Sequence, residues 1–298
     1  MDDAAERAIN RWENLAWIHQ AGDLTCAIRD LEDGGVSCGI VLELGERQFL
    51  VTAGHVLCRG HALAFIGPDG ETPIAEVRRC SRYDGKVDVG FVEVDEDSAP
   101  AFVGFAREDT LLTSLPRGES LWIGVRGCPA QYYKPQGPDR VESTDFTVPG
   151  KLVPQDEWPD SWITESFGAI RLSTSRDLLV TYPEMGGELD WVDKRGNPPR
   201  PCDLRVPHPN GFSGAGMWLL CFSRHRGSEV QFPDLKLVGI QGGFRKRLGC
   251  LRGTRIRCLL NLIAEDYSAL GDAVEQVEKQ SRNFQRRQRR LAGGGQQR

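Results

Sequence analysis

The sequence predicts a mainly β protein of the sandwich or barrel type, with helical segments at both ends. Between about residues 25 and 258, short runs of β-branched and aromatic residues alternate with turns rich in Gly, Pro and Asp. Many short strands separated by turns are typical of such antiparallel architectures. The 298 residues are enough for one large β domain or two domains of ordinary size.

The elements are expected in the following order. Residues 4–19 place apolar side chains at helical spacing and predict a short amphipathic helix. Strands are expected at 39–44, 47–53, 89–94, 169–173, 177–182 and 235–240, with long loops in the stretch 134–210. After residue 258 the helical period returns, and Gly271-Asp272 interrupts it, which predicts two C-terminal helices rather than one.

Composition limits the class of protein. The longest apolar run, residues 217–222, is too short to cross a bilayer, and the N-terminus lacks the features of a signal peptide. The 9 cysteines include no Cys-x-x-Cys pair and no Cys/His cluster with metal-ligand spacing. We therefore expect a cytoplasmic protein with reduced thiols, no membrane span, no metal and no organic cofactor.

The charge is unevenly distributed. The formal net charge is −5, but seven basic residues and no acidic ones follow Glu278, and these are Lys279, Arg282, Arg286, Arg287, Arg289, Arg290 and Arg298. The acidic remainder disfavours nucleic-acid binding except through this tail. The tail has two interpretations that the sequence leaves open: the solvated face of a terminal helix, or a docking element for an acidic protein, nucleic acid or anionic membrane.

Three separated segments carry residues suited to chemistry. FLVTAGHVL (49–57) is a strand leading into a small-residue turn that ends at His55. In KVDVGFVEV (86–94), Asp88 stands at the start of an alternating strand. In PNGFSGAGMW (209–218), Ser213 lies between glycines and precedes an apolar strand. Each feature alone is common in packed or solvated positions, and it is their conjunction that points to function.

The conjunction suits nucleophilic catalysis. A serine hydroxyl becomes a good nucleophile when an imidazole takes its proton, and the imidazole needs a carboxylate to fix its tautomer. The backbone N–H groups of Gly211 and Ser213 are spaced so that both can point at one oxyanion. The sequence therefore predicts a His55, Asp88 and Ser213 triad with an oxyanion hole at Gly211 and Ser213.

These motifs resemble those of the trypsin/chymotrypsin-like serine peptidases, in their bacterial-type, intracellular form. TAGHV (52–56) is similar to the family's Thr-Ala-Ala-His motif, DVGFV (88–92) to Asp-Ile-Ala-Leu, and GFSGAG (211–216) to Gly-Asp-Ser-Gly-Gly. LWIGVRGCP (121–129) and LVGIQGG (237–243) are weaker matches within the second half.

The resemblance implies two six-stranded Greek-key β-barrels with the catalytic groups between them. Together with the helical patterns at both ends, it divides the chain into an N-terminal helical segment (1–24), a peptidase domain (25–258, with barrels at about 25–115 and 116–258), and C-terminal helices with the Arg-rich tail (259–298). It also implies a serine endopeptidase that acts on protein or peptide substrates through an acyl-enzyme, with Gly242 and Gly243 as walls of the specificity pocket. The C-terminal helices or the tail would then be available to a regulatory partner.

The sequence also departs from the family. Phe212 replaces the aspartate that precedes the serine in many members, and Pro207 occupies the usual position of the pocket base. The long separation of Asp88 from Ser213 implies an insertion between about 130 and 205. An α/β-hydrolase is disfavoured, because it needs Gly-x-Ser-x-Gly and the order Ser, Asp, His. The remaining alternative is a catalytically silent scaffold of the same fold that acts as a protein-binding module.

Overall fold

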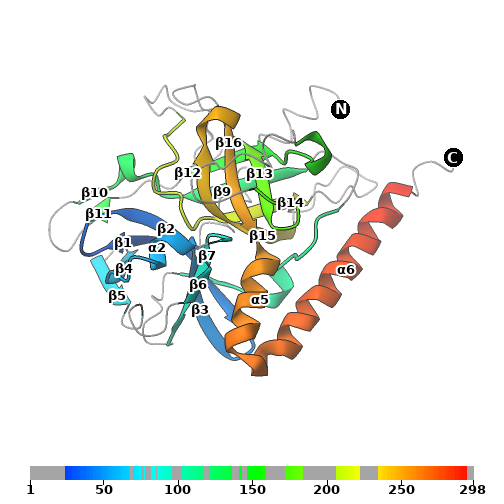
Figure 1. Ribbon diagram of the computed structural model, residues 1–298, viewed down its shortest axis with the longest axis horizontal. Helices are drawn as coiled ribbons and strands as arrows, with labels where there is room; N and C mark the ends of the chain where they lie inside the picture. The colour runs from blue at the N-terminus through cyan, green and yellow to red at the C-terminus, as the bar shows by residue number, and fades with distance from the viewer. Residues whose placement is uncertain are drawn as a thin grey trace, which may run out of the picture.

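The computed structural model is mainly β, as the sequence predicts, and its strands form two large antiparallel sheets (Figure 1). It describes residues 24–67, 70–74, 77, 82–84, 86–95, 103–116, 121–135, 141–142, 146–158, 172–183, 206–221 and 234–293. The expected N-terminal helix and much of the expected insertion lie outside these residues.

The first sheet is built from residues 25–106 and lies at the lower left of Figure 1. Its strands are β1 (Thr25–Asp30), β2 (Val36–Leu44), β3 (Arg47–Thr52), β4 (Leu63–Gly67), β5 (Gly70–Ile74), β6 (Arg82–Asp84), β7 (Val89–Val94) and β8 (Phe105–Ala106). The order is β5-β4-β1-β2-β3-β7-β6, and β8 adds to β2 in parallel. The sheet therefore has 8 strands rather than the six expected.

The second sheet lies above the first in Figure 1 and has 6 strands, in the order β12-β9-β14-β15-β16-β13. Its strands are β9 (Trp122–Gly127), β12 (Phe146–Lys151), β13 (Asp177–Thr181), β14 (Gly216–Cys221), β15 (Asp234–Arg245) and β16 (Cys250–Arg255). A small hairpin, β10 (Lys134–Pro135) with β11 (Val141–Glu142), lies apart from both sheets. Leu172 and Ser173, within the strand expected at 169–173, are irregular.

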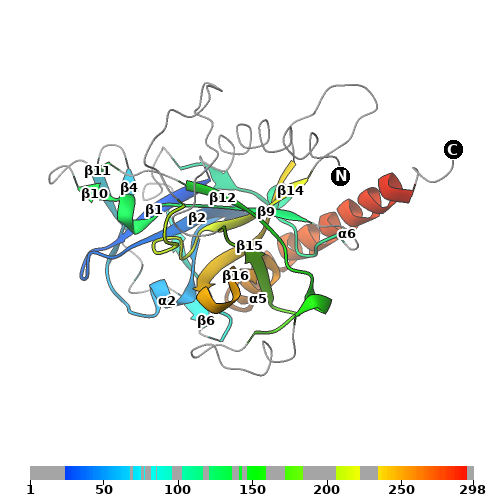
Figure 2. The same ribbon diagram turned by 90° about the horizontal axis from the view of Figure 1, so that it is seen from above.

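Two helices follow the last strand, as expected. They are α5 (Ile256–Asp266) and α6 (Gly271–Gly293), and α6 runs along one side of the molecule (Figures 1 and 2). The break between them lies at Tyr267 and a 3₁₀ turn (Ser268–Leu270), just before the expected Gly271-Asp272. No described helix is long and apolar enough to cross a membrane.

Both faces of the central strands of the first sheet are buried. In β2, Ile40 and Leu42 pack into a core shared with α5, α6 and the second sheet, while Val41 faces a separate core with Leu50 and Val92. Because successive side chains of a strand point to opposite faces, burial on both faces requires a continuous apolar run, which here is Ile40–Leu42. The shared core fixes the two sheets against each other, and Trp218 is its largest buried side chain.

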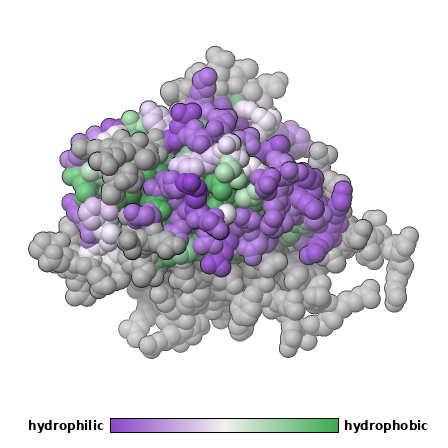
Figure 3. Space-filling model, turned by 90° about the horizontal axis from the view of Figure 1, so that it is seen from below, coloured by the Kyte–Doolittle hydropathy of each residue, from purple (hydrophilic) through white to green (hydrophobic). Residues whose placement is uncertain are grey.

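The described surface is mostly polar. Leu31 and Tyr83 are the large hydrophobic side chains exposed among the described residues. The face in Figure 3 accordingly carries mainly hydrophilic side chains with small apolar patches between them. A further core, called here the second core, lies mainly on the second sheet and includes Val125, Leu178 and Met217. On α6, Ser281 is buried and Phe284 packs against this second core, while the exposed side chains include Arg282, Arg286 and Arg287.

Candidate active site

His55 and Asp88 form a direct pair at the edge of the first sheet. His55 lies on the short helix α2 (Gly54–Leu57), which follows β3, and Asp88 immediately precedes β7. His55 Nδ1 lies 2.9 Å from Asp88 Oδ1, and the backbone N–H of His55 donates to the same oxygen at 3.0 Å. The His55 side chain is 45% exposed and that of Asp88 only 7%. A buried carboxylate thus holds an accessible imidazole.

The second sheet holds the other side of Asp88. Arg252 of β16 is 1% exposed, and its Nη1 lies 3.4 Å from Asp88 Oδ2. Its Nη2 donates to the carbonyl oxygen of Val87 at 3.1 Å, and the Thr254 hydroxyl donates to the same carbonyl. Asp88 has a φ of 59°, a left-handed conformation that is costly for a residue with a side chain. These contacts from β16 hold the strained turn in place.

The turn that carries Ser213 is attached to the same junction. The backbone N–H of Cys38, on β2, donates to the Ser213 carbonyl oxygen at 2.7 Å. Gly214 N–H donates to the Gln241 carbonyl oxygen at 2.8 Å. The next residue, Gly242, is packed so tightly against Asp88 that a Cβ atom there would lie 2.6 Å from Asp88 Oδ2. The structure therefore brings the three predicted segments together where the two sheets meet.

Two N–H groups of this turn have no backbone acceptor among the described residues. The N–H groups of Phe212, Gly214 and Ala215 donate to the carbonyl oxygens of Pro209, Gln241 and Phe212. Within the part of the chain that the structure describes, no carbonyl accepts from Gly211 or Ser213. The Asn210 carbonyl accepts from Ala130 N–H at 2.9 Å, and no described peptide bond is cis, so the Gly211 N–H points away from Ala130.

The glycines of the turn are required by geometry. Gly211 has a φ of +94°, and a Cβ there would lie 2.6 Å from Ala130 N. Gly214 has a φ of +90°, and a Cβ there would overlap the Cys38 carbonyl oxygen and the Thr52 hydroxyl. Only glycine adopts these angles without strain. Phe212 between them is fully buried in the second core, so the turn is anchored by packing.

The two residues expected to line a specificity pocket differ in their surroundings. Gly242 faces the buried side of Asp88, and a Cβ atom placed on Gly242 would lie 3.3 Å from Arg252 Nη1. A Cβ on Gly243 would meet nothing within 4 Å, so its surroundings are open. Nearby, the Phe244 ring packs 5.5 Å from Tyr182 and 6.2 Å from His208, measured between ring centroids.

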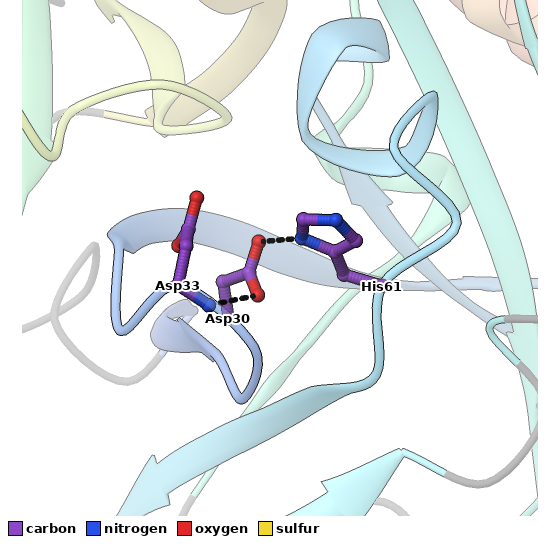
Figure 4. A group of neighbouring side chains, drawn as sticks. All are labelled: Asp30, Asp33 and His61. Atoms are coloured by element: carbon purple, nitrogen blue, oxygen red, sulfur yellow. Dashed lines mark hydrogen bonds and ion pairs between the residues drawn. The ribbon is translucent and has the colours of Figure 1, made fainter.

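A second group of titratable side chains lies on the first sheet. Asp30, Asp33 and His61 have ligand atoms within 4.8 Å of one another (Figure 4). Asp30 accepts from His61 Nδ1 at 2.7 Å and from the N–H groups of Glu32 and Asp33, and Arg59 pairs with both aspartates. Burial raises the pKa of Asp30, but these hydrogen bonds outweigh it and hold the pKa below its usual value. The group is explained as a hydrogen-bonded turn with its own cation.

Among the described residues, free thiols are found at Cys26, Cys38, Cys58, Cys250 and Cys258. Burial raises the pKa of Cys26 and Cys250, which keeps these thiols protonated.

Sequence reasoning missed three residues that support the site, namely Cys38, Asp177 and Arg252. The Cys38 thiol donates to the Gly211 carbonyl oxygen at 3.0 Å and accepts from Cys128 N–H at 3.1 Å. Arg252 and Asp177 form a buried ion pair. The available signal was Arg252 in the middle of the strand CLRGTR (250–255), since an arginine that is buried is found paired.

Comparison with known proteins gives only distant likenesses. No protein-family model matches the chain, and no curated protein matches it. Solved structures with a similar fold include human heparin binding protein (12% identity, 83% of this chain and 90% of that chain, TM-score 0.44). Others are tobacco vein mottling virus protease (10%, 80% and 79%, TM-score 0.43) and a scabies mite inactivated protease paralogue (15%, 84% and 96%, TM-score 0.44).

Proposed function

We propose that the chain is a serine endopeptidase that hydrolyses peptide bonds through His55, Asp88 and Ser213. The observation that carries this proposal is the 2.9 Å contact between His55 Nδ1 and Asp88 Oδ1 at the junction where the Ser213 turn is attached. An ionised Asp88 accepts hydrogen bonds only, so Nδ1 carries the proton and Nε2 is left as the base.

The reaction follows from these roles. His55 Nε2 takes the proton of the Ser213 hydroxyl as Oγ attacks the scissile carbonyl carbon. The carbonyl oxygen becomes an oxyanion, and the N–H groups of Gly211 and Ser213, which have no backbone acceptor among the described residues, donate to it. The C–N bond then breaks, His55 gives its proton to the leaving amine, and an acyl-enzyme remains.

Hydrolysis of the acyl-enzyme repeats the sequence with water. His55 takes a proton from water as its oxygen attacks the ester carbon, and then returns a proton to Ser213 Oγ as the ester bond breaks. Neither half of the cycle requires a metal or an organic cofactor.

The substrate and surroundings of the enzyme are proposed on the same basis. Because His55 is exposed, a protein or peptide chain can reach it. The space beside Gly243 is open, so a side chain of the substrate can enter there with Gly243 as a wall of the pocket. Free thiols at Cys26, Cys38, Cys58, Cys250 and Cys258 fit the cytoplasm. The exposed arginines of α6 offer a site for a regulatory partner.

The test is proteolysis by purified protein, measured on a mixture of denatured proteins with mapping of the new termini. Ser213→Ala is expected to lower kcat on the order of 10⁶-fold, with His55→Ala equally severe. Asp88→Asn should lower kcat about 10⁴-fold. Ser175→Ala is a matched control, because it makes the same substitution at an exposed serine outside the proposed triad, whose hydroxyl contacts Ser173. Hydrolysis that survives Ser213→Ala contradicts the proposal, and a folded wild type that binds proteins without cutting them supports the silent scaffold.

A further inference from the structure

Arg252 connects Asp88 to a second buried aspartate. Its Nε and Nη2 donate to Asp177 Oδ1 at 3.0 and 2.8 Å, while Nη1 lies 3.4 Å from Asp88 Oδ2. Asp177 is fully buried at the start of β13 and accepts from Ser173 N–H at 2.6 Å. The three charged groups therefore form one row, Asp88–Arg252–Asp177, behind the face of Asp88 that holds His55.

Burial makes this arrangement consequential. A charge buried in the protein interior is costly unless it is paired and hydrogen-bonded. Interactions between charges are stronger in the interior than in solvent. The planar guanidinium presents several donors in a fixed geometry, so it orients its partners as well as neutralising them. Arg252 meets that description, since it bonds the Asp177 carboxylate, the Asp88 carboxylate and the Val87 carbonyl together.

We propose that Arg252, fixed by Asp177, is a positioning residue that orients the Asp88 carboxylate and sets the pH range in which His55 accepts a proton. This inference rests on the proposed function, because it concerns the same His55–Asp88 pair. Asp88, Arg252 and Asp177 together carry one negative charge beside the imidazole. A change in that sum alters how strongly the protonated imidazole is stabilised.

The sign of the effect differs between variants. Arg252→Met leaves two negative charges, which stabilise the imidazolium, so the acidic limb of the pH–rate profile moves to higher pH. Asp177→Asn leaves no net charge, so the limb moves to lower pH. Each shift is expected to be on the order of one pH unit. A merely structural role for the ion pair predicts no such opposite shifts.

Other charged groups around the row are unchanged in these variants. Arg176 pairs with Asp177 Oδ2 at 3.0 Å from the outer side. Arg245 of β15 faces all three groups, and its pKa is lowered by burial and by the Arg252 charge. Arg255 and Cys258 lie near Asp177, and burial lowers the pKa of Arg255 and raises that of Cys258.

The experiment measures the rate of Ser213 modification by a fluorophosphonate probe between pH 5 and 9, with thermal unfolding of each variant. Arg252→Lys keeps the charge but loses the planar fork, so its limb stays near that of wild type while its plateau rate falls about 10-fold. Arg176→Met is the matched control. It removes a cation from the same Asp177 without contact to Asp88, and should leave the limb within about 0.3 pH unit of wild type.

The outcomes separate this inference from the proposed function. A wild type that is not modified at Ser213 contradicts the proposed function itself. A wild type that is modified, with Arg252→Met and Asp177→Asn limbs that coincide with it, leaves the proposed function intact and overturns the role of Arg252. If Arg252→Met does not fold, the question is decided by two other measurements. These are the position of the acidic limb in Asp177→Asn and the plateau rate in Arg252→Lys.

Discussion

The backbone N–H of Cys38 donates to the carbonyl oxygen of Ser213 at 2.7 Å, and the Cys38 thiol donates to the carbonyl oxygen of Gly211 at 3.0 Å. One residue of the first sheet therefore holds both ends of the serine turn, which belongs to the second sheet. Cys38 is fully buried, and its own carbonyl oxygen accepts from the Thr52 hydroxyl at 2.7 Å. The proposed oxyanion hole thus depends on contacts that join the two sheets.

Cys38→Ala should lower kcat more than it changes KM. The substitution removes the donor to the Gly211 carbonyl and the acceptor for Cys128 N–H, which loosens the oxyanion donors without touching the substrate. Loss of buried hydrogen-bond partners costs about 1–3 kcal/mol of stability. Cys26→Ala is the matched control, because Cys26 is buried in the core of the first sheet. Steady-state kinetics and urea unfolding of both proteins check the prediction, and equal loss of kcat in the two variants would contradict it.

Gly214→Ala should destabilise the protein on the order of 3 kcal/mol or more and abolish Ser213 reactivity. The alanine would have to adopt the φ of +90° found at Gly214, and its Cβ would overlap the Cys38 carbonyl oxygen. Gly249→Ala separates strain from crowding, since Gly249 has a φ of +59° with nothing within 4 Å of the added Cβ. That control should cost only about 1–2 kcal/mol. Denaturant unfolding measures both, and similar losses would show that the close approach to Cys38 is unimportant.

Acid should weaken the contribution of Asp30 to stability. The pKa of Asp30 lies below its ordinary value in the folded protein, so its contribution is fully present above the unfolded pKa of about 3.9. It is lost as the pH falls through the lower folded value. Asp30→Asn keeps the oxygen that accepts from the N–H groups of Glu32 and Asp33 but loses the charge. The deficit in its free energy of unfolding relative to wild type should therefore shrink as the pH falls.

Urea unfolding at a series of pH values from 3 to 7 measures that deficit. Asp33→Asn is the control, because its more exposed carboxylate makes a solvent-screened pair with Arg59. A deficit for Asp30→Asn that is constant or grows toward pH 3 would argue against the predicted linkage.

Alkylation of the native protein should distinguish its thiols. Cys58 is exposed, whereas Cys26 and Cys250 are buried with raised pKa values. Because the thiolate is the reactive form, iodoacetamide at pH 8 should modify Cys58 well before the two buried residues. Peptide mapping by mass spectrometry gives the order, with the urea-unfolded protein as the reference in which all three react. Equal rates in the native protein would mean that Cys26 and Cys250 are open to solvent.

Much of this arrangement could be predicted from local sequence. The apolar runs 47–53 and 89–94 correspond to β3 and β7, and the motifs around His55, Asp88 and Ser213 identified segments that meet at one junction. The supporting contacts could not be predicted in the same way. Arg252 and Asp88 are 164 residues apart, and Cys38 and Gly211 are 173 apart. Such pairs depend on how the two sheets pack, and local sequence patterns do not predict that packing.

The central claim is that Ser213 is a nucleophile activated by His55, and covalent labelling tests it most directly. The purified protein is treated with a fluorophosphonate probe at pH 8, and the modified peptide is identified by mass spectrometry. We predict one adduct on Ser213, lost in His55→Ala and in protein unfolded by urea, and retained in Ser175→Ala. A folded wild type that carries no adduct on Ser213, or an adduct that persists in His55→Ala at an unchanged rate, would contradict the account.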